Sequence, residues 1–230
     1  MKNFSKRFKT EKKKINKETL YTIDDAIGLV KETASAKFNE SIEAHITLNI
    51  DPKYADQQLR TTVALPHGTG KDLKIGALIS DENFSEAKEA GADIYGNDEL
   101  IDQITQGNLD FDLLITTTEM MPKLAKLGRI LGPKGLMPSP KAGTVTTNLK
   151  ETISEFKKGK LEYRADKTGI VHINFGQADF NQEKLLENFI AFFNSVKNNK
   201  PVGVKGKYIK KVTVCSTMGP GIPLKFDELT

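Results

Sequence analysis

The stretch Ile42-Glu43-Ala44-His45-Ile46-Thr47-Leu48-Asn49-Ile50 alternates apolar and polar residues without a break. Successive side chains of a strand point to opposite faces of a sheet, so this pattern predicts a strand with one buried face and one polar face. A helix is expected before it, because an apolar stripe at three- to four-residue spacing follows Thr22. Residues 60–65 predict a second strand.

The last third of the sequence returns to this character. Strands are expected over 160–164 and 169–175, joined by a turn at 165–168, and a final strand covers 208–217. Between them a long helix is expected. Its apolar face carries Leu185, Phe189, Phe192 and Val196.

The middle of the sequence alternates strands with helices. The expected strands are 73–79, 92–95 and 111–116, and the expected helices are 84–90, ended by Gly91, 99–105 and 120–127. Such alternation predicts a small parallel sheet with helices packed on its faces. Gly and Pro are expected to exclude regular structure from residues 128–143.

The simplest architecture is an α+β fold of two domains. Residues 1–67 and 159–230 form one discontinuous domain, and residues 68–158 are inserted into it as an α/β domain. The two chain crossings are expected to act as a hinge. The hinge residues are Pro66, Gly68 and Gly70 at the first crossing and Gly159 at the second.

The net charge of +4 is unevenly distributed along the chain. Residues 1–67 carry 12 Lys and Arg against 9 Asp and Glu, residues 159–230 carry 11 against 7, and residues 68–158 carry 11 against 14. The two ends therefore sum to +7 and the middle to −3. This favours one basic unit and one mildly acidic unit, although ordinary charge scatter explains it equally well. The Lys-rich first twenty residues are either a solvated arm that reaches phosphates or a solubilising tail.

Bulk composition indicates a globular chain that works where it is made. Apolar residues make up 38% and charged residues 28% of the 230 positions, unlike a disordered chain. The single cysteine, Cys215, cannot form an internal disulfide, which fits a reducing compartment. No apolar run approaches the roughly 18–20 residues of a membrane span, and the first twenty residues resemble no secretory signal.

No catalytic, cofactor or metal motif is expected. The segment Gly68-Thr69-Gly70-Lys71 lacks the earlier glycine and the following Ser or Thr of a phosphate-binding loop, and Leu73 stands where a dinucleotide fingerprint needs a third glycine. His45, His67 and His172 show no ligand spacing. Glu43 with His45 fits satisfied surface polar residues better than a catalytic pair.

Four segments carry a resemblance to a known family. The segment Leu127-Gly128-Arg129-Ile130-Leu131-Gly132-Pro133-Lys134-Gly135-Leu136-Met137-Pro138 closely resembles the core motif of the ribosomal protein L-one family. Residues 62–71, 166–172 and 216–220 are similar to three further motifs of that family, in the same order. Residues 54–62 and 137–140 look most like its cyanobacterial and plastid branch.

The resemblance implies a discontinuous split β-α-β RNA-binding domain with an inserted Rossmann-like, three-layer α/β domain. It implies RNA contacts around three places: Phe38 with Glu43, the turn Asp166-Lys167-Thr168, and the end turn Thr217-Met218-Gly219. Lys167 and Lys205 are suited to neutralise phosphates. Each position also has a plainer interpretation: Phe38 as a core residue, Lys167 as a turn lysine, and residues 217–219 as a strand-ending turn. Asn39, where many members carry Asp, and Thr117-Thr118-Glu119 depart from the family pattern.

The implied partners follow from the same resemblance. They are large-subunit ribosomal RNA at the mobile stalk, the exit-site tRNA whose release the stalk assists, and, in bacterial members, the protein's own messenger RNA. The protein is then a monomer within the ribosome, of a plastid stroma or a bacterial cytoplasm, with no cofactor, no metal and no membrane. The alternatives are a nucleotide-dependent enzyme that uses the α/β domain and a basic protein-only scaffold.

Overall fold

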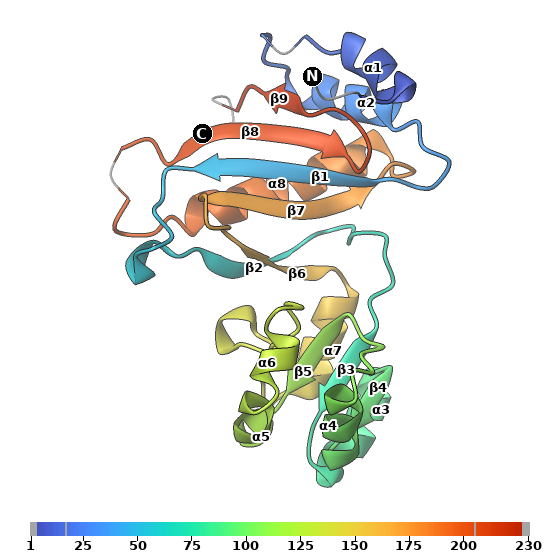
Figure 1. Cartoon of the computed structure of the whole chain (residues 1–230), viewed down its shortest axis with the longest axis vertical. Helices are drawn as coiled ribbons and strands as arrows, with labels where there is room; N and C mark the ends of the chain where they lie inside the picture. Colours follow the sequence, from blue (N-terminus) through green and yellow to red (C-terminus); the bar gives the residue numbers. More distant parts are fainter. Residues whose placement is uncertain (1–3, 17, 205, 227–230) are drawn as a thin grey trace. The chain divides into compact units, whose positions relative to one another are not determined.

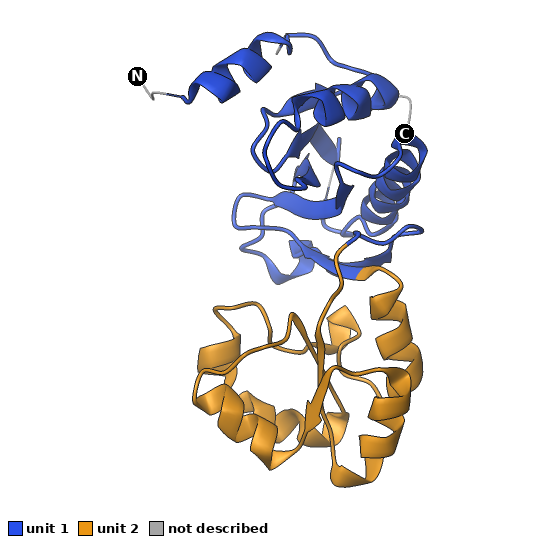
Figure 2. Cartoon of the chain, turned by 90° about the vertical axis from the view of Figure 1, so that its right-hand side faces the viewer, with its two compact units in different colours: residues 1–70, 161–230 blue, residues 71–160 orange. Residues whose placement is uncertain are grey.

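The computed structural model describes residues 4–16, 18–204 and 206–226. It is a mixed α/β fold with three sheets. The chain folds into two compact units, Met1–Gly70 with Leu161–Thr230 (unit 1) and Lys71–Lys160 (unit 2), coloured separately in Figure 2. Within the described residues, no helix is both long and apolar enough to cross a membrane.

Unit 1 is built on an antiparallel four-stranded sheet in the order β7-β1-β8-β9. Its strands are β1 (Ser41–Leu48), β7 (Ile170–Gln177), β8 (Ile209–Ser216) and β9 (Ile222–Leu224). The apolar residues of β1 that begin with Ile42 are buried in the core of this unit, whereas Glu43 and His45 are half-buried on the other face. The alternation of the sequence thus becomes a buried face and a polar face.

Two helices pack against the sheet of unit 1. They are α2 (Ile23–Thr33) and α8 (Gln182–Asn198), which lies behind the sheet in Figure 1. The predicted apolar face of α8 is confirmed, because its four residues are buried. Thr22 caps α2 by accepting a hydrogen bond from the Asp25 amide. A second sheet of this unit pairs β2 (Arg60–Ala64) with β6 (Lys160–Arg164), after the short 3₁₀ helix η1 (Ala55–Gln57).

Unit 2 contains the predicted parallel sheet, in the order β4-β3-β5. The strands are β3 (Ile75–Leu78), β4 (Ile94–Gly96) and β5 (Leu113–Thr116). One apolar cluster joins the sheet to α3 (Phe84–Ala90) and α7 (Leu149–Lys157). A second cluster joins it to α4 (Asp98–Thr105), α5 (Met121–Ala125) and α6 (Gly128–Leu131). Helices therefore cover both faces of this sheet, which gives three layers.

The prediction that residues 128–143 lack regular structure is wrong in two places. The short helix α6 spans Gly128–Leu131, and a 3₁₀ turn, η4, spans Pro140–Ala142. Glycine lowers helix propensity by only about 1 kcal/mol. Burial of the fully enclosed Leu131 side chain in the core of unit 2 outweighs that cost. Two further 3₁₀ turns, η2 (Asp81–Asn83) and η3 (Thr118–Met120), precede α3 and α5.

Part of the Lys-rich start of the chain, Lys6–Lys13, is helical. Helix α1 (Lys6–Lys13) is capped by the Ser5 side chain, which accepts a hydrogen bond from the Phe8 amide. Glu11 and Ile15 are buried, and Ile15 belongs to the core of unit 1. The run of lysines around these residues gives no sequence signal that Ile15 packs into the core. Helix α7 and strand β9 are also additional to the expected elements.

Candidate nucleic-acid interface

The strand register places the expected RNA-contact residues in two groups. Ile42 pairs with Ser216, so the loop before β1 and the turn after β8 lie at one end of the sheet. Thr47 pairs with Ile170, so the turn before β7 lies at the other end. We call the first group, Phe38, Thr217, Met218 and Gly219, the Met218 cluster, and the second, Asp166, Lys167 and Thr168, the Asp166 turn. Glu43 lies on β1 between them.

Two apolar side chains of the Met218 cluster are exposed. Phe38 is 53% and Met218 is 51% exposed, so Phe38 is not the core residue of its plainer interpretation. The backbone around them is held in place: the Thr217 amide donates to the Ser41 carbonyl at 3.0 Å, and the Ser41 amide donates to Thr217 Oγ1 at 3.0 Å. A Cβ on Gly219 would lie 2.4 Å from Ser216 Oγ, so a larger residue there would displace the Ser216 hydroxyl.

A buried carboxylate, Glu40, ties the two loops of the Met218 cluster together. It is 1% exposed. Its oxygens accept hydrogen bonds from the Ala36 amide at 2.8 Å and the Met218 amide at 2.9 Å. Arg7 of α1 lies 4.0 Å from the same carboxylate and donates to the Met218 carbonyl at 3.2 Å. Burial alone would raise the pKa of Glu40, but these amides and the Arg7 charge lower it.

The carboxylate of Asp166 accepts hydrogen bonds from its own turn. It accepts hydrogen bonds from the amides of Thr168 and Ile170 and from the Thr168 hydroxyl, all at 2.8–2.9 Å. Desolvation alone would raise the pKa of Asp166, but these bonds and one from His172 lower it to about 2. The ammonium group available to an anion in this turn is that of Lys167, which is exposed.

The polar face of the sheet carries a chain of hydrogen-bonding side chains from three strands. His45 Nδ1 lies 2.8 Å from His172 Nδ1, and His45 Nε2 lies 3.2 Å from Cys215 Sγ. Burial, and then the proximity of His172, lower the pKa of His45. Burial, and then the Glu43 charge, raise the pKa of the Cys215 thiol to about 11. The environment of this face therefore disfavours the charged form of both side chains.

Three of the four expected hinge residues adopt backbone angles that favour glycine. Gly68, Gly70 and Gly159 have φ of 62°, 73° and 111°. The segment that contains Gly68 is held in unit 1 by Asn188, which is fully buried and donates to the Gly68 carbonyl at 2.8 Å. Gln177 donates to the Gly70 carbonyl at 2.8 Å. Any bending at this crossing is therefore expected after Gly70. Pro66 is exposed ahead of this segment.

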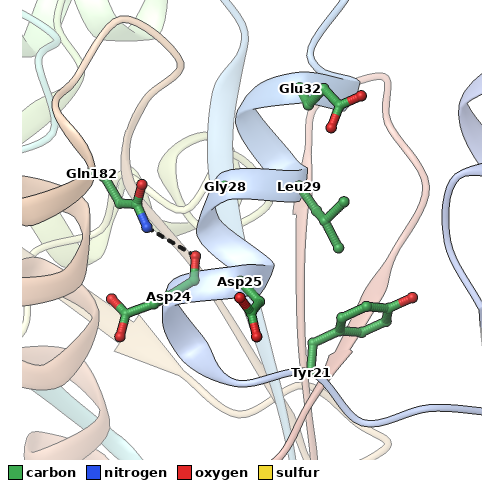
Figure 3. A pocket seen from close by; sticks show the side chains of 7 residues that line it. All are labelled: Tyr21, Asp24, Asp25, Gly28, Leu29, Glu32 and Gln182. Carbon is green, nitrogen blue, oxygen red and sulfur yellow. Dashed lines mark hydrogen bonds between the residues drawn. The ribbon is translucent and has the colours of Figure 1, made fainter.

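A pocket on α2 shows chemistry unlike that of an RNA site. It is lined by Tyr21, Asp24, Asp25, Gly28, Leu29, Glu32 and Gln182, and Figure 3 shows the Gln182 amide donating to the Asp24 carbonyl, at 3.0 Å. Three carboxylates disfavour phosphate at this place. We therefore do not include this pocket in the candidate RNA surface.

Sequence reasoning missed the residues that support the candidate site. Arg7 was one cation in a Lys-rich run, and Glu40 was one polar residue ahead of a strand; only the fold places both against Met218. The pairing of Cys215 with Glu43, and of His172 with His45, follows from strand register and leaves no spacing signal. Lys205, the remaining expected RNA contact, lies outside the described residues.

Comparison with known proteins identifies the family. The chain matches the Ribosomal protein L1p/L10e family over residues 30–220. Large ribosomal subunit protein uL1c of Phaeodactylum tricornutum (strain CCAP 1055/1) is 60% identical over 227 residues, which cover 99% of each chain. Large ribosomal subunit protein uL1 of Prochlorococcus marinus (strain MIT 9515) is 56% identical over 229 residues, covering 100% of this chain and 97% of that protein. The chain therefore belongs to the Ribosomal protein L1p/L10e family and is a ribosomal protein, not an enzyme.

Proposed function

We propose that this protein is a structural constituent of the large ribosomal subunit and that unit 1 binds the ribosomal RNA of the stalk beside the tRNA exit site. The observation that carries the proposal is the Met218 cluster. Two apolar side chains, Phe38 and Met218, stand exposed on loops that a buried carboxylate holds in place. Exposed apolar side chains on a fixed backbone are suited to contact a partner, because little conformational entropy is lost when they bind.

The chemistry of this surface suits structured RNA. Proteins recognise such RNA mainly through its shape, its 2′-hydroxyl groups, its phosphates and stacking on aromatic rings. Phe38 offers a ring, Thr217 and Thr168 offer hydroxyl groups, and Lys167 offers an ammonium group at the far end of the sheet. Glu43 and Asp166 add carboxylates, which accept hydrogen bonds from 2′-hydroxyl or base donors. The positive balance of residues 1–67 and 159–230 favours an anionic partner for this unit.

The remaining parts of the proposal concern domains and partners. Residues 1–67 with 159–230 act as the RNA-binding domain, and residues 68–158 act as the inserted domain. The hinge lies at the two crossings, at the end of the Pro66–Gly70 segment and at Gly159. The stalk then assists the release of deacylated tRNA, and the protein represses its own messenger where that RNA carries a similar junction. The names of the relatives support a place in the ribosome, of a plastid or of a bacterium.

Binding to a stalk RNA fragment tests the central claim. The purified full chain is titrated against the stalk helix junction and against an unrelated hairpin of equal length, at two salt concentrations. We expect tighter binding to the junction and an affinity that falls as salt rises, because phosphate contacts release counterions. Equal and weak binding to both RNAs would leave a merely basic protein and would overturn the proposal.

A further inference from the structure

Three metal-ligating side chains meet on the polar face of the unit 1 sheet. Glu43 and His45 lie two residues apart on β1 and so share one face, and Cys215 lies directly opposite Glu43 on β8. One ligand atom from each lies within 4.8 Å of the other two. His45 Nε2 is 3.2 Å from Cys215 Sγ and 3.9 Å from Glu43 Oε2.

A second pair of residues fixes which nitrogen of His45 faces this cluster. His172 Nε2 lies 3.5 Å from Asp166 Oδ2, and His172 Nδ1 lies 2.8 Å from His45 Nδ1. A His172 ring that donates from Nε2 to the carboxylate accepts at Nδ1. His45 must then donate from its own Nδ1, which leaves the lone pair of Nε2 directed at Cys215 and Glu43. Metal-ligating histidines generally donate their second ring N–H to an acceptor that fixes the tautomer, and His172 supplies that acceptor here.

We propose that Glu43, His45 and Cys215 bind a divalent transition metal ion, with zinc as the best fit. A thiolate, an imidazole and a carboxylate are all zinc donors, and three protein ligands leave the fourth tetrahedral position to water. Donors of a tetrahedral zinc ion lie about 3.5 Å apart, close to the separation of Cys215 Sγ and His45 Nε2. The Glu43 side chain, 38% exposed, completes the set by a small rotation. On binding, the Cys215 thiol gives its proton to solvent.

The proposed metal site shares Glu43 with the proposed RNA surface, but Cys215 is not among the RNA contacts. A Cys215 variant therefore separates loss of metal binding from loss of RNA binding. Cys215 is also the only cysteine of the chain. Any thiolate-to-metal charge-transfer absorption therefore reports this residue alone.

The experiment is a metal titration of the reduced, chelator-treated full chain with Co²⁺, followed by displacement with Zn²⁺. We expect one equivalent of Co²⁺ to produce a thiolate charge-transfer band that Zn²⁺ removes. The melting temperature should rise with zinc, because an ion that binds only the folded state stabilises it. In Cys215→Ser, a nearly isosteric change, the band and the zinc-dependent rise should vanish, with zinc affinity at least about tenfold lower.

Two further variants separate the site from general metal uptake. His172→Gln should keep the band but weaken zinc affinity by about tenfold, because it removes the partner that orients His45. His67→Gln is the matched control, since His67 pairs with Glu187 of α8 at 2.6 Å and not with the cluster; its zinc affinity should equal that of the wild type. Absence of the band in the wild type, or equal zinc affinity in wild type and Cys215→Ser, would overturn the inference.

Discussion

Met218 offers the most direct single-residue test of the RNA surface. Its side chain is half exposed at the end of β8, so a replacement leaves the core of unit 1 intact. Met218→Asp removes an apolar contact and places a negative charge beside phosphates. We expect the affinity for the stalk junction to fall on the order of 30-fold, about 2 kcal/mol, in fluorescence anisotropy at fixed salt.

Tyr54→Asp is the matched control for this change. Tyr54 is 60% exposed in unit 1 and lies outside the proposed surface. The same new charge should therefore change the affinity by no more than about threefold, since Tyr54 is not among the proposed contact residues and an exposed charge is screened by salt. A folded Met218→Asp variant with unchanged affinity would remove Met218 from the surface. Equal losses in both variants would mean that charge, and not position, weakens binding.

Asp166 should make the stability of the protein depend on pH in the acid range. Its pKa of about 2 in the folded protein lies below the ordinary value of 3.8. The contribution of this carboxylate to the free energy of unfolding is therefore fully present above about pH 4 and is lost as the pH falls through about 2. We expect Asp166→Asn to be less stable than the wild type near neutral pH, with a difference that shrinks in acid.

Urea unfolding of both proteins at several pH values between about 6 and 3 measures this difference. Lys167→Gln serves as the control, because its side chain is an exposed neighbour in the same turn. Its difference from the wild type should stay nearly constant over the range. If the gap between Asp166→Asn and the wild type also stayed constant, the carboxylate charge would not hold the turn.

Between elements, Glu40 connects the loop before β1, the turn after β8 and helix α1. Glu40→Ala leaves the part-buried amides of Ala36 and Met218 without their acceptor, which costs about 1 kcal/mol of unfolding free energy. We also expect the RNA affinity of the folded protein to fall by about tenfold, because both loops of the Met218 cluster lose their anchor. Thermal unfolding and anisotropy measured on the same sample separate the two effects.

Glu40→Gln distinguishes positioning from stability alone. A glutamine keeps one acceptor oxygen but loses the charge that pairs with Arg7, so it should restore part of the affinity lost in Glu40→Ala. A lower melting temperature with unchanged RNA affinity in both variants would show that Glu40 stabilises the fold without positioning the surface.

Local pattern predicted most single elements because each depends on its own periodicity or end signal. The helix ended by Gly91 is an example, since the structure spans Phe84–Ala90 and Gly91 adopts a left-handed conformation. Helix α6 could not be predicted, because its stability comes from Leu131 packing in unit 2 and not from propensity. Helix α1 was obscured for a related reason, since a run of lysines hides the buried Glu11 and Ile15.

The sequence predicts single residues of the candidate site but not the contacts between them. Phe38, Met218 and Lys167 are exposed in loops, as contact residues must be, and their positions came from motif resemblance. The hydrogen bonds that hold their loops in place depend on tertiary structure. Glu40 and Met218, for example, are 178 residues apart in sequence, so no local pattern can pair them. The same limit applies to Cys215 and His45, which meet 170 residues apart through strand register.

At the scale of the whole molecule, the two units have separate apolar cores. The cluster of unit 1 contains residues from both ends of the chain, and the two clusters of unit 2 share no residue with it. The segment before unit 2 is also secured within unit 1, by Asn188 and Gln177. Since each core is complete in itself, either unit should fold when the other is removed.

Because the two cores are separate, unit 1 should bind RNA without unit 2. A variant in which a short Gly-Ser linker replaces residues 71–160 tests this. Because the basic ends and the Met218 cluster remain, we expect it to bind the stalk junction within about threefold of the full chain, with the same salt dependence. The isolated segment 71–160 is the control and should not distinguish the junction from an unrelated hairpin. Anisotropy and circular dichroism on both pieces measure binding and folding. If the isolated middle segment bound the junction while the joined ends, still folded, did not, the RNA-binding domain would have to be reassigned to unit 2.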